Sequence, residues 1–399
     1  MNSKRHTTLA VLALVFISLV LRPPIAAVGP LLHSISGELQ LNAASTSLLA
    51  SVPVFCFGLG AFLSPWLMRR FGLNHVMFVT LIVMAVAIVS RVWFGYSILL
   101  LATVLVGLSI AVANVLLPTF VRSDFTDRAS IFTSIYTTLL AIAASFSAAF
   151  AVQWADLLGD WRLAMLTPAL PLFVAIALWW PRVREAEPHL PIAGHAAKAE
   201  SRAVYRSPVA WAILLFFGIQ SLGFYALLGW LPTMLISIGV DPASAGSFLG
   251  LATAIGIPSG FALAPLIARL KSLSTLAAIA SLSTTAGFAF LAVIIGAHDP
   301  TNSAAIIFAG ILISVGQTAT FPMSLSLIAT RASSRAQTTM LSAFAQGWGY
   351  LISGVATFAV GAIGASVSWK AAVVVLVVLS AIQVAIGFYA GRNTHIPAA

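Results

Sequence analysis

The chain has 399 residues, of which 60% are hydrophobic and 8% are charged, with a formal net charge of +10. Soluble globular domains carry about 25% charged residues, so this composition excludes a soluble enzyme and predicts a polytopic membrane protein. The basic balance does not indicate a nucleic-acid partner, because cations in short loops orient a membrane protein in its lipid bilayer.

Twelve apolar runs of about 20 residues predict twelve membrane spans. Their approximate bounds are 8–32, 44–68, 73–93, 97–120, 129–153, 161–180, 208–236, 244–268, 272–296, 303–328, 336–362 and 367–391. The first run follows Lys4 and Arg5 as in a signal peptide, but it is too long and lacks a small-residue cleavage site. The sequence therefore predicts an all-α polytopic membrane protein with twelve transmembrane helices.

A polar segment, 181–207, carries five cations and separates the spans into six and six. We expect an N-terminal six-helix bundle over 1–180, a cytoplasmic linker over 181–207 and a C-terminal six-helix bundle over 208–399. Three pairs of short segments recur in the same order in the two halves: 64–69 and 264–269, 127–129 and 334–336, 160–162 and 368–370. Six spans return the chain to the same side, so the repeat predicts two similar bundles related by an axis along the membrane normal.

The loop cations predict the orientation of the chain. Sixteen of the 20 Lys and Arg residues fall on one predicted side, whereas Arg91, Arg162 and Lys370 fall on the other and Arg22 lies within the first span. Because cations accumulate in cytoplasmic loops, we expect both termini and the linker to be cytoplasmic.

The first predicted span contains Arg22, followed by Pro23 and Pro24. Arginine stays protonated in essentially any protein setting, and a guanidinium near the bilayer centre costs at least about 2.5–3.5 kcal/mol, so it must face protein, water or a ligand. The prolines lack N–H groups, so the carbonyls of Leu19 and Val20 lose their helical partners and need a cavity or buried partners. We interpret Arg22 as the main contact for a solute in a membrane cavity.

The acidic residues offer Arg22 no counter-ion within the predicted spans. All ten fall in loops or at span ends: Glu38, Asp124, Asp127, Asp156, Asp160, Glu185, Glu187, Glu200, Asp241 and Asp299. An anionic solute would therefore supply the missing negative charge. Proton-driven carriers commonly use a carboxylate within the membrane, which this sequence lacks. His33, near the outer end of the first span, is the remaining candidate proton carrier, and an ordinary interfacial histidine is the alternative.

The twelve spans, six plus six about a central cytoplasmic loop, resemble the major facilitator superfamily. The signature of that family between its second and third spans is partly present. Arg70 and Gly72 match it, but Arg69 stands where an acid is expected and Pro65 stands where a glycine is expected. The sequence thus departs from the residues that form the usual charge-relay gate.

A closer resemblance, over nearly the whole chain, is to the branch that holds cyanate permeases and 2-nitroimidazole transporters. The residues that carry it are Arg22-Pro23-Pro24, Gly29-Pro30, Phe217-Gly218-Ile219-Gln220-Ser221, Tyr225, Trp230-Leu231-Pro232, Gly316-Gln317, Phe321-Pro322 and Gln346-Gly347-Trp348-Gly349-Tyr350. This resemblance implies secondary transport by alternating access in a bacterial inner membrane, and it does not select one solute.

The resemblance also implies a central cavity lined by spans one, four, seven and ten, with help from five, eight and eleven. The candidate substrate-binding residues are then Arg22, Asn114, Gln220, Tyr225, Gln317, Gln346 and Tyr350. The alternative role for the amides is hydrogen bonding between helices. The nearby aromatic residues either clamp a flat solute or pack against lipid and protein: Phe217, Phe224, Tyr225, Trp230, Phe321 and Trp348.

Other motifs bear on gating and energy supply. The candidate gate or hinge residues are Pro23, Pro24, Arg70, Gly72, Pro232 and Pro322, because proline kinks helices and the Arg and Gly belong to the partial signature. There is no phosphate-binding Gly-Lys motif, which argues against ATP drive. The single cysteine, Cys56, excludes a disulfide framework and a cysteine metal cluster, and we expect no metal and no cofactor.

The sequence therefore predicts a carrier, and not an enzyme, for a small polar or anionic organic solute, such as a cyanate-like anion or a nitroimidazole-like compound. We expect a monomer, with a coupling proton as the candidate energy source. One alternative is an exporter of largely apolar aromatic compounds, which cationic dyes would reveal. The other is a membrane receptor or enzyme, against which the short linker and the absence of paired membrane carboxylates argue.

Overall fold

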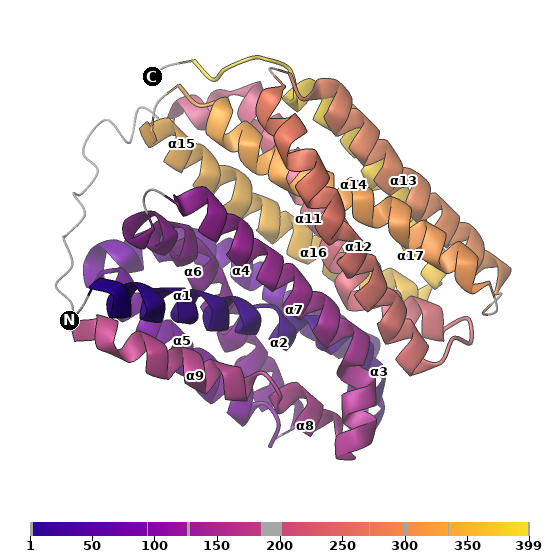
Figure 1. Ribbon diagram of the computed structural model, residues 1–399. Helices are drawn as coiled ribbons and strands as arrows, with labels where there is room; N and C mark the ends of the chain where they lie inside the picture. Colours follow the sequence, from indigo (N-terminus) through magenta and orange to yellow (C-terminus); the bar gives the residue numbers. More distant parts are fainter. Residues whose placement is uncertain are drawn as a thin grey trace.

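The computed structural model describes residues 3–93, 95–125, 128–184, 202–270, 272–298, 300, 302–333 and 335–397. In this part of the chain the backbone forms helices and connecting turns, without a strand (Figure 1). The all-α prediction is confirmed. Most of the predicted linker, 185–201, lies outside the described residues.

The helices form an N-terminal and a C-terminal group (Figure 1). The N-terminal group comprises α1 (Ser3–Val20), α2 (Pro23–Ala26), α3 (Val28–Glu38), α4 (Ala43–Phe71), α5 (Leu73–Ser90), α6 (Tyr96–Asp124), α7 (Ala129–Leu158), α8 (Trp161–Leu166), α9 (Ala169–Trp179) and η2 (Trp180–Arg184). The C-terminal group comprises α11 (Pro208–Ile236), α12 (Pro242–Arg269), α13 (Ser274–Ala297), α14 (Ser303–Thr330), α15 (Arg335–Ser342), η3 (Ala343–Trp348), α16 (Gly349–Ser366) and α17 (Trp369–Ala390). The bundle boundaries at 180 and 208 remain predictions.

Eleven helical segments among the described residues are long and apolar enough to cross a membrane, so the chain is a multi-pass membrane protein. The predicted eighth span, which forms α12, is not one of the eleven, although it is 28 residues long. The side chains of 259–265 in this helix lie outside the described set. The count is consistent with the twelve predicted spans.

Three predicted spans are interrupted helices rather than single ones. The first is divided into α1, α2 and α3, and the sixth is divided at Thr167 and Pro168, where proline removes a backbone donor. The eleventh contains the π-helix η3 between two α-helical pieces. Sequence reasoning located these spans by apolar length, which does not reveal a local change of helix type.

Several helices begin at capping residues that explain their bounds. Ser207 and Asp241 each precede a proline at the first helical position, and their side chains accept hydrogen bonds from the backbone N–H groups of Ala210 and Ser244 at 3.4 and 3.0 Å. Such caps satisfy donors that the first turn of a helix leaves unpaired. The bounds of α11 and α12 therefore follow from local sequence.

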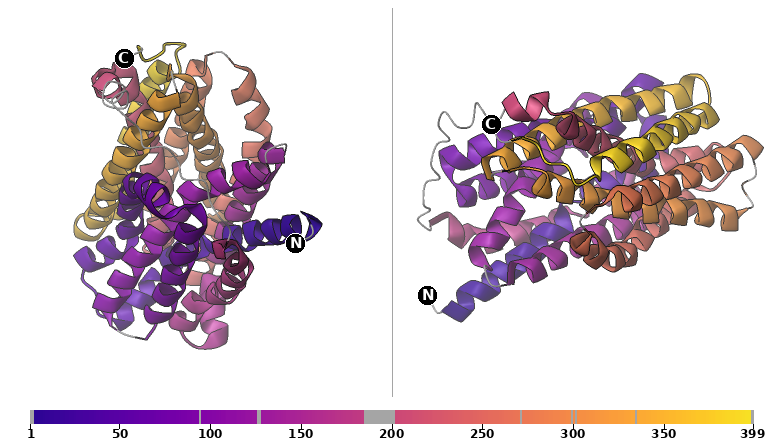
Figure 2. Two further views of the ribbon diagram at one scale, coloured as in Figure 1. Left: turned by 90° about the vertical axis from the view of Figure 1, so that its left-hand side faces the viewer. Right: turned by 90° about the horizontal axis from the view of Figure 1, so that it is seen from above.

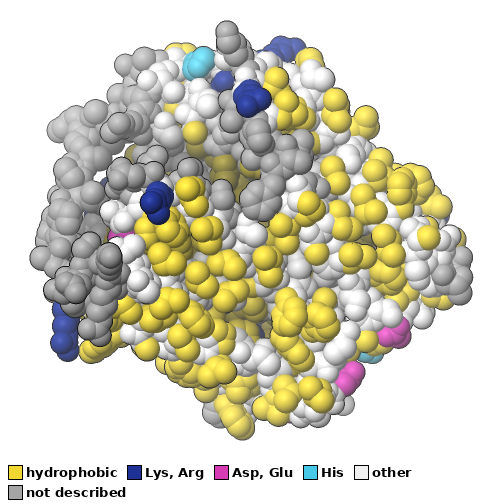
Figure 3. Space-filling view, viewed as in Figure 1, with side chains coloured by type: hydrophobic (Ala, Val, Ile, Leu, Met, Phe, Trp, Pro, Cys, Tyr) yellow, Lys and Arg dark blue, Asp and Glu magenta, His cyan; other side chains and the backbone are white. Residues whose placement is uncertain are grey.

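The outer surface fits a lipid environment. Hydrophobic side chains are spread over much of the coloured surface in Figure 3, and the Lys and Arg side chains lie toward its upper and left parts. Large apolar residues such as Val79, Leu170 and Val293 are more than half exposed. A surface of this kind is stable against lipid chains and would be costly in water.

Close approaches of backbone hold the two groups together. Gly29 of α3 packs against the carbonyl of Leu228 in α11, so that a Cβ atom at this position would clash with backbone. Gly250 of α12 packs in the same way against Ala149 of α7. Small residues of this kind allow membrane helices to approach closely and gain dispersion energy.

These approaches lie toward one end of the molecule. Gln153, near the end of α7, donates from Nε2 to Oγ of Ser247, near the start of α12, at 3.3 Å. The start of α1 and the last described residues lie on the opposite side (Figures 1 and 2). These contacts between the two helix groups therefore lie far from the N-terminal and C-terminal residues of the described chain.

We expect Gly29→Val to weaken this packing, because its side chain would meet the Leu228 carbonyl. The measurement is crosslinking of cysteines placed at Gln153 and Ser247 by a short bifunctional thiol reagent, in a chain whose buried Cys56 is replaced by Ala. Gly29→Val should lower the yield severalfold. Gly37→Val is the control, because a Cβ at Gly37 on the same helix meets nothing within 4 Å. Equal yields in the two variants would contradict the prediction.

A second prediction concerns Glu38, which joins α3 to α8 outside the membrane-spanning segment. Its carboxylate accepts from Nε1 of Trp161 and from Nη1 of Arg162, both at 2.6 Å. These two hydrogen bonds, that of Trp161 first, hold the pKa of Glu38 below its usual value. A lowered carboxyl pKa stabilises the fold above the unfolded pKa of about 4.3, and this stabilisation is lost as the pH falls through the folded value.

The melting temperature should therefore fall more steeply below about pH 5 in the natural chain than in Glu38→Gln. Near neutral pH the difference should be at most about 2–4 °C, since exposed ion pairs contribute less than about 1 kcal/mol. Thermal unfolding in detergent across this pH range provides the measurement. Parallel curves for the two proteins would refute the role of Glu38.

Candidate functional site

The site is built around the interruption of the first span. Arg22 lies between the end of α1 and the start of α2, and its carbonyl accepts from the N–H groups of Ile25 and Ala26 at 3.1 and 3.0 Å. The consecutive prolines Pro23 and Pro24 carry no N–H, so the α1 ladder ends here. The sequence thus forms a turn at the position of its membrane arginine.

The Arg22 side chain crosses from the N-terminal to the C-terminal helix group. Its Nη1 donates to the hydroxyl of Tyr225 in α11 at 3.3 Å. Arg22 is half-buried, and Tyr225 is buried. Among the described residues, no carboxylate lies within ion-pair distance of Arg22. Arg22 and Tyr225, both predicted as substrate contacts, are therefore hydrogen-bonded to each other.

An aromatic cluster surrounds this contact, and we define it as Phe57, Phe217, Phe224, Tyr225, Phe321 and Tyr350. The ring centre of Phe57 lies 5.4 Å from that of Tyr225 and 5.5 Å from that of Tyr350. Phe57 belongs to α4, whereas the other rings belong to α11, α14 and α16. The cluster therefore joins the two helix groups at the position where Arg22 meets Tyr225.

The polar atoms at the Arg22–Tyr225 contact are hydrogen-bond donors. Arginine has five N–H donors and no acceptor, and one of these N–H groups donates to the hydroxyl of Tyr225, which also contacts the hydroxyl of Tyr350. A planar guanidinium can donate two parallel hydrogen bonds to a group with two oxygens. The arrangement suits a negatively charged or acceptor-rich solute, and it repels a cation.

The predicted amide contacts have partners of their own. Nε2 of Gln220 donates to Oε1 of Gln317 at 3.1 Å, and both side chains are buried between α11 and α14. Nε2 of Gln346 donates to Oγ of Ser342 at 2.7 Å within its own helix. The hydrogen bond between Gln220 and Gln317 corresponds to the interhelical alternative, whereas that of Gln346 stays within one span. Asn114 is half-buried on α6, and no hydrogen bond in the described part of the chain connects it to Arg22.

The other predicted residues are spread over the molecule. Pro23 and Pro24 form the turn itself, Pro232 is buried in α11, and Pro322 is half-buried within α14. At the other end, Arg70 is exposed and Gly72 has a φ of 78° between α4 and α5, which favours glycine. His33 is exposed on α3. Gating and proton transfer by these residues remain predictions.

Two of the six candidate clamp aromatics lie outside the cluster. Trp230 is buried and donates from Nε1 to the carbonyl of Thr357 at 3.1 Å, so it joins α11 to α16. Trp348 is 45% exposed and packs edge-on against Phe62. For these two residues the structure agrees with the packing alternative.

Arg91 lies in the turn after α5, where a loop cation was expected, but its burial was not predicted. The side chain is fully buried at the end of α5, where Nη1 donates to the carbonyl of Pro24 at 3.0 Å and Nη2 donates to that of Met165 at 3.1 Å. Oγ of Ser147 donates to the carbonyl of Pro23 at 3.2 Å. The sequence analysis expected free carbonyls at Leu19 and Val20, whereas Arg91 and Ser147 bind the carbonyls of Pro24 and Pro23, so these contacts were not predicted.

Arg182 lies in the segment that the sequence analysis assigned to the linker. It lies in η2, where its guanidinium contacts the carboxylate of Asp124 at 2.7 and 2.9 Å and lies over the rings of Phe120 and Trp179. This ion pair is largely buried and joins the end of α6 to the end of α9. The predicted linker therefore begins with a residue that belongs to the N-terminal core.

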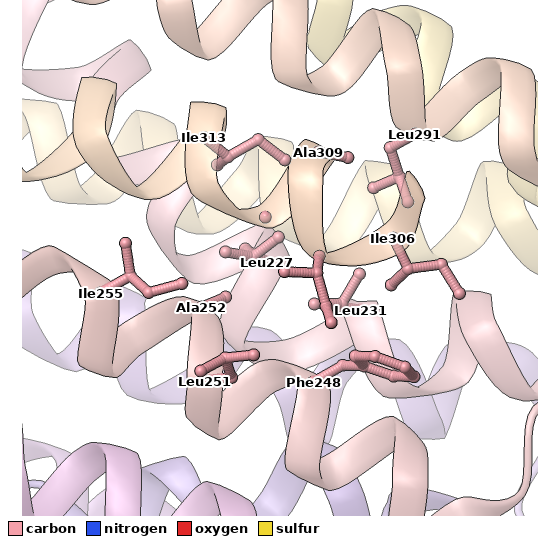
Figure 4. A pocket seen from close by; sticks show the side chains of 12 residues that line it. Leu227, Leu231, Phe248, Leu251, Ala252, Ile255, Leu291, Ile306, Ala309 and Ile313 are labelled. Atoms are coloured by element: carbon pink, nitrogen blue, oxygen red, sulfur yellow. The ribbon is translucent and has the colours of Figure 1, made fainter. Parts of the chain in front are cut away.

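A separate hollow lies within the C-terminal group (Figure 4). Its lining comes from α11, α12, α13 and α14 and includes Leu227, Leu231, Phe248, Leu291 and Ile313. No charged side chain lines it, so it does not offer the interactions that an anion requires. The chemically distinctive site is the one at Arg22.

Two transporters of known substrate are similar to this chain in sequence. The 2-nitroimidazole transporter of Escherichia coli (strain K12) is 31% identical over 400 residues, which cover 99% of this chain and 98% of that protein. The cyanate transport protein CynX of the same organism is 27% identical over 347 residues, which cover 86% and 87% of the two chains.

Solved structures show the same fold. A D-xylose–proton symporter superimposes with a TM-score of 0.76 and 14% identity, over 98% of this chain and 99% of that one. The family and these relatives are transporters and not enzymes. Because the sequence model of the Major Facilitator Superfamily matches residues 12–357, the chain belongs to that family.

Proposed function

We propose that the chain is a secondary active transporter that binds a small, flat, anionic or acceptor-rich organic solute at Arg22. The observation that carries this proposal is the hydrogen bond from Arg22 to Tyr225, which joins the two helix groups without a carboxylate partner among the described residues. A solute with negative charge would compensate the guanidinium, and alternating access would expose the site to each side in turn.

The aromatic cluster supports a flat solute. Aromatic faces favour stacked or edge-on contact with other π-systems at separations of 4.5–7 Å, the range in which these rings lie from one another. Cyanate and 2-nitroimidazole, which the names of two relatives specify, are both small conjugated acceptors. We propose a solute of this kind for the present chain.

A second candidate is export of largely apolar aromatic compounds. The rings of the aromatic cluster favour it. The two functions differ in their response to charge. The uncompensated Arg22 favours anions over lipophilic cations, so efflux of cationic dyes from cells would support the second function and contradict the first.

We propose that the chain is a monomer in a bacterial inner membrane, with both termini in the cytoplasm. The relatives named above are bacterial transporters, and the cation distribution supports this orientation. In that orientation the packing of α7 against α12 lies at the periplasmic end.

The orientation predicts which positions an impermeant thiol reagent can reach in intact cells. Cysteines at Gly37 and at Tyr205, both exposed, would be introduced one at a time into the Cys56→Ala chain. Position 37 should be labelled from outside, and position 205 should be labelled only after permeabilisation. Labelling at 205 with protection at 37 would reverse the topology.

Substitutions of Arg22 test the binding site. Arg22→Lys keeps the charge but loses the planar fork, and Arg22→Ala removes both. If both nitro oxygens of 2-nitroimidazole are recognised together, both variants should lose about 2–4 kcal/mol of binding of this solute, or about 30- to 1,000-fold in affinity. If only the positive charge matters, the Arg22→Lys variant should retain much of the affinity for the solute.

The measurement is solute affinity and melting temperature in detergent, with 2-nitroimidazole and cyanate as the solutes. Arg69→Ala, at an exposed position, serves as the control for the loss of a surface cation. A drop in melting temperature without a change in affinity would identify a structural arginine. Unchanged affinity in a well-folded Arg22→Ala protein would end the proposal that this residue holds the solute.

A further inference from the structure

The turn that carries Arg22 is held by two side chains, Arg91 at the end of α5 and Ser147 of α7. The carbonyl of Pro24 accepts from Nη1 of Arg91 at 3.0 Å, and the carbonyl of Pro23 accepts from Oγ of Ser147 at 3.2 Å. The second nitrogen of Arg91, Nη2, donates to the carbonyl of Met165 in α8 at 3.1 Å. Arg91 thus joins α2 to the end of α5 and to α8. It does so at Pro24, which lies two residues after Arg22.

Burying Arg91 carries a considerable cost. The residue is fully buried, its Nε has no hydrogen-bond partner, and its ion-pair distance to every described carboxylate exceeds 4.0 Å. A buried charge without a counter-ion is unfavourable even when carbonyl dipoles solvate it. A neutral donor such as Ser147 could satisfy a single carbonyl, as the neighbouring bond shows. The planar guanidinium of Arg91 does more than the Ser147 hydroxyl, because its two terminal nitrogens reach carbonyls of two different helices at once.

We propose that Arg91 is a positioning residue for Arg22. By holding the Pro24 carbonyl against α5 and α8, it fixes the direction in which the Arg22 side chain leaves the turn and so aligns the guanidinium with Tyr225. This inference rests on the proposed function for its effect on solute binding, but its effect on the turn does not depend on that function.

The first test is independent of any solute. A nitroxide at Arg22→Cys, in the Cys56→Ala chain, reports the mobility of the turn by electron paramagnetic resonance. Arg91→Met should increase this mobility, and Arg91→Lys should increase it less, because a lysine can reach one of the two carbonyls. Arg162→Met is the matched control, because Arg162 pairs with Glu38 at the same end and does not contact the turn. An unchanged spectrum in Arg91→Met, or an equal change in Arg162→Met, would overturn the proposal.

The second test is a double-mutant cycle on binding of 2-nitroimidazole and cyanate. Arg91→Met should lower affinity about 10- to 100-fold, the range expected when a contact residue is misplaced by about 1 Å. In the Arg22→Ala background Arg91→Met should have no further effect, because its influence passes through Arg22. Additive losses would contradict positioning and indicate an independent role.

The two tests also separate this inference from the proposed function. If Arg22→Ala leaves affinity unchanged while Arg91→Met still mobilises the nitroxide, the proposed function fails and the anchoring of the turn stands. If Arg22→Ala abolishes binding while Arg91→Met changes neither affinity nor mobility, only the positioning role fails. Should Arg91→Met prevent folding, Arg91→Lys and Ser147→Ala carry the same comparisons with milder changes.

Discussion

The organisation of this chain depends on one cation placed in a medium that does not solvate it. Arg22 cannot lose its proton, and the described residues provide it with a tyrosine hydroxyl rather than a carboxylate. A membrane protein retains such a residue at a cost in stability, which is offset by packing elsewhere. The surrounding features can be understood as means of keeping this guanidinium in one place and partly exposed.

The local sequence makes that placement possible. Pro23 and Pro24 end α1, and their own carbonyls accept hydrogen bonds from Ser147 and Arg91. The Pro23 carbonyl also accepts a hydrogen bond from the backbone N–H of Ala27, so the turn keeps part of its helical pairing. The interruption therefore supplies both the position of the charge and the sites for its support.

The fold could be predicted from the sequence to a large extent. Apolar length located the spans, and the motifs around Arg22 and in the seventh, tenth and eleventh spans indicated the family. These features are local, because a membrane span must satisfy its backbone within about 20 residues. Helix breaks at Thr167 and in η3 were not predicted, since apolar length is insensitive to them.

The candidate site was predicted only in part, because its chemistry depends on contacts between distant segments. The sequence identified Arg22 and Tyr225 separately, but 203 positions separate the two residues of their hydrogen bond. Gln220 and Gln317 are polar residues in spans whether they face a solute or each other, and periodicity cannot distinguish the two cases. Phe57 carries no polar atom and gave no signal. Arg91 sits where loop cations usually sit, and its burial was not predicted because it depends on α8 lying beside it.

The close approach of Gly29 to Leu228 has a mechanical consequence for the site. Gly29 lies seven residues after Arg22, and Leu228 lies three residues after Tyr225, so the same two chain segments touch through backbone and through side chains. At about 1.5 Å of rise per residue in α11, the backbone contact is a pivot about 4.5 Å along the helix axis from Tyr225. A rotation of about 15° about that pivot moves Tyr225 by about 1 Å. Such a displacement is enough to break the hydrogen bond between Arg22 and Tyr225 while the pivot itself hardly moves, so the geometry converts a small relative rotation of two helices into the release of a charged group.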